Sequence, residues 1–206
     1  MRWPMPTPEQ FDEEERGVYD RVCERQSALW SVGGPGAYFG PLLNSPALGG
    51  MVSDLGSFFK TGGKRGTLPD EVREFADLVC GKELGSYSMF AGHIPDAVAV
   101  GVRPEAVAAI WHGNDSLLTE DEGRLASYVR ATIAGKLSDD DCAAMQGRYG
   151  VRGAMELTVF ITFLCMTARL MDAVGIASPS SGDVERFIAG FTEGSAAVPD
   201  PTARTG

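Results

Sequence analysis

Three residues on one predicted helix have types and spacing suited to acid/base chemistry. Ser86, Met89 and His93 are spaced i, i+3 and i+7, so a helix would place them on one face. Histidine takes up and returns a proton near neutral pH, which makes His93 the candidate general acid/base. Pro95 cannot donate a hydrogen bond to the carbonyl of Ala91, and it predicts a kink or a helix restart beside His93.

Glu74 is the candidate partner of His93, because a nearby carboxylate would fix the tautomer of the imidazole and raise its basicity. Its helix turns Val72, Phe75 and Val79 inward, so Glu74 lies on the opposite face. Two interpretations follow. Glu74 is a solvated carboxylate, or it faces the site because the His93 helix or another subunit covers that second face.

The chemistry open to such a site is proton transfer next to a carbonyl. Decarboxylation of a β-keto or vinylogous acid, double-bond isomerisation and lactone chemistry all belong to this class. Tyr87, Ser86 or an arginine would stabilise charge that develops on a substrate carbonyl or carboxylate. The competing interpretation is that His93 is a structural, hydrogen-bonded residue, as a single histidine on an amphipathic helix commonly is.

A metal site is not expected. The second histidine, His112, falls at a helix end just before Gly113, where the helix dipole favours a cation and a structural role. Two histidines on different helices without an HExxH-like pairing give little support for a metal. We therefore expect an enzyme that needs neither a metal nor another cofactor.

Composition limits the partners. The chain has 206 residues and a formal net charge of −10, which disfavours nucleic acid and anionic membrane surfaces as partners. The most apolar stretch, residues 157–168, is about half as long as a membrane span. No export signal is recognisable and the four cysteines lack metal-like spacing, so we expect reduced thiols and a cytoplasmic protein.

The elements that must position these residues are helices throughout, with hardly any strand signal. Thr7, Thr67 and Ser138 are predicted to begin helices, and Gly81 and Gly85 to end one. A Gly/Pro-rich loop is expected over 31–41 and a basic glycine-rich loop over 61–66. The predicted helices cover approximately 8–29, 46–60, 68–80, 86–100, 104–112, 120–134, 152–174 and 183–191. A further short helix, capped by Ser138, is predicted to bear Cys142 and Met145.

These patterns predict an all-α protein with one principal domain. Residues 1–40 would form an N-terminal helical arm with the Gly/Pro loop, and residues 41–193 the helical domain. Residues 194–206 are too polar and too interrupted by proline to form an element of their own, so we expect a flexible tail.

Four segments in order resemble the carboxymuconolactone decarboxylase family of the AhpD-like superfamily, and together they span approximately residues 38–176. The segment 38–46 is similar to the family's entry run before a helix, and Leu68-Pro69 with Arg73-Glu74 to its next helix. Tyr87, Phe90 and Ala91 leading to His93, with Ala97 and Gly101 beyond, are similar to its signature helix. Glu156-Leu157 and Arg169-Leu170 fit the long helix that follows.

The resemblance implies an AhpD-like helical fold and a homo-oligomer, either a dimer, a trimer or a hexamer. The superfamily's peroxidase branch has a Glu nineteen residues before its His, as Glu74 precedes His93, and a CxxC pair that falls here on Ser86 and Met89. Neither residue can supply the thiolate that disulfide exchange needs. The acidic residues that often precede the histidine in the decarboxylase branch are also missing, which implies a different substrate.

The functional expectation is a cofactor-independent lyase or isomerase of a small carbonyl, carboxylate or lactone substrate. His93 would be the acid/base and Glu74 its partner. Tyr38 and Phe39 either line the pocket mouth or lie buried beneath the Gly/Pro loop. The alternatives are an AhpD-like thiol antioxidant using Cys80 and Cys165, and a ligand-binding oligomer without activity. The residues expected to contact substrate are Ser86, Tyr87, Met89, Phe90, Tyr38 and Phe39.

Overall fold

A computed structural model describes residues 2–30, 33–60 and 66–200; for residues 28–30 and 60 it describes the backbone only. Within these residues every regular element is helical, which confirms the all-α prediction. Two short 3-10 helices accompany the α-helices, η1 (Pro8–Gln10) and η2 (Asp115–Leu117). The α-helices are α1 (Glu13–Trp30), α2 (Gly36–Leu42), α3 (Pro46–Lys60), α4 (Asp70–Glu83), α5 (Tyr87–Ala99), α6 (Pro104–His112), α7 (Glu120–Ala134), α8 (Asp139–Val174) and α9 (Ser181–Thr192).

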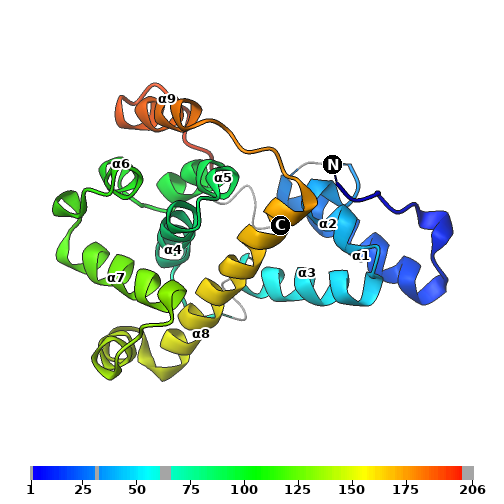
Figure 1. Ribbon diagram of the computed structural model, residues 1–206, viewed down its shortest axis with the longest axis horizontal. Coiled ribbons are helices and arrows are strands. Elements are labelled where there is room, and N and C mark those ends of the chain that lie inside the picture. The colour runs from blue at the N-terminus through cyan, green and yellow to red at the C-terminus, as the bar shows by residue number, and fades with distance from the viewer. Residues whose placement is uncertain (1, 31–32, 61–65, 201–206) are drawn as a thin grey trace.

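Helix α4 is at the centre of the fold. It packs against α5, α6, α7 and α8, while α1, α2 and α3 gather on the other side of α8 (Figure 1). Its inward residues Phe75, Leu78 and Val79 join Phe90 and Ile94 of α5 in one continuous core, which α8 extends with Leu157, Phe160, Ile161 and Leu164. Because both faces of α4 are covered, residues on the face opposite Phe75 are also buried.

The connection between α4 and α5 fixes how the two helices meet. The sequence prediction that Gly81 ends the helix is wrong, because α4 continues to Glu83. Gly81 instead allows close approach, since a Cβ built there would lie 2.9 Å from the backbone nitrogen of Phe90 on α5. The chain turns out of the helix at Gly85, whose φ of +67° suits glycine, and the Ser86 N–H donates to the Gly81 carbonyl at 2.8 Å.

The start of α4 also differs from the prediction. Thr67 does not cap this helix, which begins at Asp70 after Pro69. Thr67 is used in tertiary structure instead: its backbone N–H and its hydroxyl donate to Glu156 Oε2 of α8, at 2.6 and 2.8 Å. Because the acceptor is a carboxylate, both hydrogen bonds are charge-assisted. Residues 61–65 of the predicted basic loop lie outside the described residues.

Two predictions near the N-terminus need correction. Thr7 and Gln10 do form a reciprocal capping box, but it closes only the 3-10 turn η1. Helix α1 begins separately at Glu13, because the Asp12 side chain accepts a hydrogen bond from the Glu15 N–H at 2.9 Å. Further on, Tyr38 and Phe39 belong to α2 and not to a loop.

The predicted division of the long C-terminal helical region is confirmed. Gly150 has non-helical backbone angles, φ 71° and ψ 167°, so α8 consists of a short helix capped by Ser138 and a longer one after Gly150. By length and composition alone, α8 is the one described helix long and apolar enough to cross a membrane. One of its faces packs into the core through Leu157, Ile161 and Leu164.

The N-terminal segment is attached to the end of α8. The Trp3 indole N–H donates to the Ala173 carbonyl at 3.2 Å, and the Arg2 guanidinium donates to the Asp172 carbonyl at 2.9 Å. Helix α2 spans the predicted boundary between residues 40 and 41. The described part of the C-terminal tail, residues 195–200, forms no helix, and residues 201–206 lie outside the described part.

Candidate active site

His93 and Glu74 meet across the interface between α4 and α5. His93 Nδ1 lies 2.7 Å from Glu74 Oε2, which is hydrogen-bond distance for a charge-assisted pair. Both side chains are largely shielded from solvent, with 14% of the His93 side chain and 7% of the Glu74 side chain exposed. The face of α4 that carries Glu74 is therefore covered by the His93 helix, one of the two arrangements that would bring Glu74 into the site.

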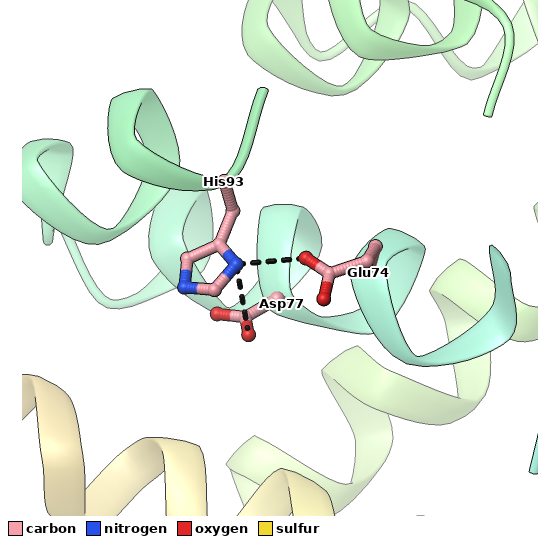
Figure 2. Close-up of side chains that lie close together, drawn as sticks. All are labelled: Glu74, Asp77 and His93. Carbon is pink, nitrogen blue, oxygen red and sulfur yellow. Dashed lines mark hydrogen bonds and ion pairs between the residues drawn. The ribbon is translucent and has the colours of Figure 1, made fainter. Parts of the chain in front are cut away.

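A second carboxylate faces the same nitrogen. Asp77 lies one turn after Glu74 on α4, and its Oδ2 is 3.4 Å from His93 Nδ1 (Figure 2). Its side chain is fully buried. Two buried carboxylates beside one imidazole stabilise the protonated ring by their negative charge, because attraction between charges is strong where water is excluded.

The two ring nitrogens of His93 have different environments. Nδ1 points toward Glu74 and Asp77, whereas Nε2 lies on the far side of the ring (Figure 2). A hydrogen bond donated from Nδ1 to Glu74 selects the tautomer whose Nε2 has the lone pair. This arrangement suits a base that takes a proton at Nε2 while the carboxylates stabilise the resulting positive charge.

His93 lines a cavity of about 280 Å³ between α1, α2, α3, α5 and α8, to which α4 contributes Asp77. Most of its wall is apolar and aromatic. The apolar side chains come mainly from α8, opposite the histidine, and those around the cavity are Phe39, Met89, Phe160, Phe163, Leu164 and Met171. Such a lining favours an apolar ligand body.

The polar part of the wall contains one arginine and several hydroxyls. Arg25 is held in place, because its guanidinium donates to Ser53 Oγ at 2.6 Å and to Asp54 Oδ1 at 2.9 Å. The hydroxyl oxygens of Tyr38 and Thr167 are buried without hydrogen-bond partners. Burial raises the pKa of Tyr38, and the nearby Thr167 hydroxyl acts in the opposite direction. Tyr38 is therefore a neutral phenol at physiological pH.

Three of the residues predicted to contact substrate line the cavity: Tyr38, Phe39 and Met89. The first two do so from a helix and not from beneath a loop. Ser86 lines a smaller neighbouring cavity of about 100 Å³ that shares Ser88 and Met171 with the larger one.

Tyr87 and Phe90 are placed elsewhere, which corrects their predicted role. Their rings pack against Trp111 of α6, with centroids 4.9 and 5.1 Å away, and Phe90 is fully buried in the core. At about 100° per residue, Tyr87 lies about 120° around α5 from His93, whereas Phe90 lies only about 60° away. Phe90 is kept from the site by packing between Gly81 of α4 and Trp111 of α6. Pro95 lies inside α5, which continues from Tyr87 to Ala99, so the helix does not restart there.

Several residues of the site were missed by sequence reasoning. Asp77 could have been found, because it is spaced i+3 from Glu74 and so shares its face of α4. Arg25, Phe163 and Thr167 come from α1 and α8, far from His93 in sequence. No local pattern marks them, so only the packing of those helices brings them to the cavity.

The same three residues could also hold a metal ion. Among the described residues, Glu74, Asp77 and His93 form a group whose possible ligand atoms all lie within 4.8 Å of one another. Two carboxylates and an imidazole suit a divalent cation such as zinc or manganese. The 2.7 Å contact between His93 and Glu74 equally suits a direct hydrogen bond, and a chelation experiment distinguishes the two arrangements.

The other titratable groups that were considered from sequence are unsuited to catalysis where they lie. Burial raises the pKa of the Cys80 thiol well above its usual value, and it also raises the pKa of Cys165. Both thiols are therefore protonated and weakly nucleophilic at neutral pH. His112 ends α6 at the surface, with its Nε2 3.6 Å from Glu185 Oε2, in keeping with a structural role.

In comparisons with known proteins, no protein-family model, curated protein or solved structure matches the chain. The class of protein defined by fold and site is therefore a helical protein with a buried imidazole–carboxylate cluster on an apolar cavity. The likeness to the carboxymuconolactone decarboxylase family is a resemblance of motifs.

Proposed function

We propose that this protein is a cofactor-independent enzyme that transfers a proton next to a carbonyl group, as a decarboxylase or an isomerase does. The observation that carries the proposal is the 2.7 Å contact between His93 Nδ1 and Glu74 Oε2 at the wall of a cavity of about 280 Å³. A histidine that is oriented by a carboxylate and largely shielded from solvent is suited to act as a general base.

In the proposed reaction, His93 Nε2 removes a proton from the carbon next to a substrate carbonyl. The C–H electron pair moves toward the carbonyl oxygen and gives an enolate, and His93 returns the proton to the same or another carbon. Glu74 and Asp77 stabilise the imidazolium between these two steps by their charge. In a decarboxylase, loss of carbon dioxide would generate the same enolate and His93 would protonate it.

We also propose that the fold is AhpD-like and that the chain forms a homo-oligomer in the cytoplasm. The order of the helices and the position of His93 on α5 support the first statement. A stripe of exposed apolar side chains on α8 supports the second, because exposed apolar patches commonly mark association surfaces. The stripe consists of Val151, Met155, Val159 and Met166.

Deuterium exchange tests the proposal without knowledge of the natural substrate. The protein is incubated in deuterated buffer with a panel of small ketones, keto acids and lactones, and deuterium incorporation at carbon is followed by NMR. We expect exchange above background for at least one compound, and a fall of roughly 10²- to 10⁴-fold in the variant His93→Ala.

The variant His112→Ala is the matched control, because it removes the other histidine at an exposed position outside the cavity. It should leave the exchange rate unchanged. If the wild-type protein binds compounds in the cavity but exchanges none of them, the ligand-binding alternative replaces the enzymatic one. If His93→Ala exchanges as fast as the wild type, another group is the base.

A further inference from the structure

We infer that the His93 cavity binds a neutral, largely apolar ring compound bearing a carbonyl or hydroxyl oxygen, and not an organic acid. This inference names the substrate class of the proposed proton-transfer site and rests on that proposal; it selects the isomerase form, because a decarboxylase must bind a carboxylate. Three properties of the wall support it: its size and aromatic lining, its charge, and two neutral buried hydroxyl groups.

The size and lining of the cavity favour a compound with one or two rings. Its volume of about 280 Å³ is roughly twice the ~150 Å³ of an apolar cavity that accommodates benzene. Phe39 from α2 and Phe160 and Phe163 from α8 contribute aromatic surface to the wall. Aromatic walls bind flat rings by offset or edge-to-face contacts, which add to the energy of removing apolar surface from water.

The charge of the wall disfavours an anion. Within the part of the chain that the structure describes, Glu74 and Asp77 place two carboxylates beside the single imidazole of His93. The one cationic side chain of the wall, Arg25, already shares its charge with Asp54 and donates to Ser53. A carboxylate substrate would approach like charges in a site with little water, where repulsion is costly.

Two buried hydroxyl groups of the wall are neutral. The hydroxyls of Tyr38 and Thr167 lie beside each other, and neither forms a hydrogen bond with any other described residue. Such groups cost free energy unless something satisfies them, and each can both donate and accept. A carbonyl or hydroxyl oxygen matches two neutral hydroxyls, whereas an isolated carboxylate would be left without a compensating charge.

The test compares two compounds that differ in charge and in one methyl group, whose burial accounts for roughly fourfold in affinity. 4-Oxo-4-phenylbutanoate is an anion at pH 7, and its methyl ester is neutral with the same aromatic ketone. Binding of each to the wild-type protein is measured by isothermal titration calorimetry. We expect the ester to bind at least tenfold more tightly than the acid. Equal or tighter binding of the acid, or no binding of the ester up to its solubility limit, overturns the inference.

Variants then assign the preference to the named groups. Asp77→Asn removes one charge at constant size, so it should strengthen binding of the acid severalfold and narrow the gap between the two compounds. Tyr38→Phe removes one hydroxyl and should weaken binding of the ester. Phe163→Ala should weaken ester binding about tenfold, through lost apolar contact. Phe187→Ala, at an exposed position on α9, is the control and should change neither affinity.

The two proposals fail in different ways. Deuterium incorporation next to the ketone of the ester reports proton transfer, whereas calorimetry reports only which compound the cavity accepts. If the ester binds tightly but exchanges no deuterium, the proposed function is contradicted, whereas the preference for neutral ligands is upheld. If the acid binds more tightly and exchanges deuterium, the preference for neutral ligands is contradicted, whereas proton transfer is upheld.

Discussion

The substitution Gly81→Ala tests how the α4–α5 interface positions the site. A Cβ at residue 81 would lie 2.9, 3.0 and 3.1 Å from the backbone nitrogen, Cα and Cβ of Phe90. Two of these are main-chain atoms of α5, so no flexible side chain can move aside. Restoring ordinary contact requires α5 to shift by about 0.5 Å away from α4, which is the direction that separates His93 from Glu74.

Two opposing effects set the size of the change. Overpacking of a core costs about 1–3 kcal/mol, and replacing glycine by alanine within a helix returns up to about 1 kcal/mol. The expected net loss of about 1–2 kcal/mol corresponds to a fall in Tm of roughly 2–8 °C for a chain of this length. A shift of half an ångström at the catalytic pair should also lower the deuterium exchange rate about tenfold.

Thermal unfolding followed by circular dichroism measures the first effect, and the exchange assay measures the second. Gly147→Ala is the matched control, because Gly147 is exposed in α8 and a Cβ there would meet nothing within 4 Å. It should leave Tm unchanged or raise it slightly. If Gly81→Ala behaves like Gly147→Ala in both assays, close helix approach does not set the geometry of the site, and the reasoning is refuted.

Three further predictions concern stability, cofactors and assembly. Hydrogen bonds from Thr67 and Arg152 outweigh burial and lower the pKa of Glu156 below 4.5, so its stabilisation is present above that pH and is lost as pH falls. In urea unfolding, Glu156→Gln should therefore cost about 1–3 kcal/mol at pH 7, with a smaller difference from the wild type at acidic pH. Treatment with EDTA should leave the deuterium exchange rate unchanged; loss of activity that a divalent metal restores would instead assign Glu74, Asp77 and His93 to a metal. Light scattering should give the molar mass of a dimer, trimer or hexamer. The variant Met155→Glu, on the exposed α8 stripe, should lower that mass because it places a charge on the proposed association surface. A monomeric wild-type protein would contradict the homo-oligomer proposal.

Much of the helical architecture could be predicted from local sequence. Capping residues and glycine ends act over one turn, so Thr119, Ser138, Gly113 and Gly135 mark helix boundaries wherever the helices lie in space. Errors arose where tertiary contacts involved residues that also carry a local signal. Thr67 has the side chain of a helix cap, but α4 begins three residues later at Asp70, and Thr67 donates to Glu156 of α8.

The catalytic candidates were predictable for a similar reason. The i, i+3, i+7 spacing of Ser86, Met89 and His93 is a local property of one helix, and it brought Met89 and His93 to the same cavity. The same rotation turns Tyr87 away from His93 and toward Trp111. Phe90, three residues before His93, is excluded only by tertiary packing against Gly81 of α4 and Trp111 of α6.

What the sequence alone determined is therefore most of the helices, α2 excepted, and the choice of His93 as the residue around which chemistry could be organised. Only the tertiary structure decided whether Glu74 faced water or the histidine, because that depends on α5 covering a second face of α4. The close approach at Gly81 makes that covering possible. The cavity likewise needs α1, α2, α3 and α8 to converge on α5, and non-local packing of this kind leaves no pattern in any one segment.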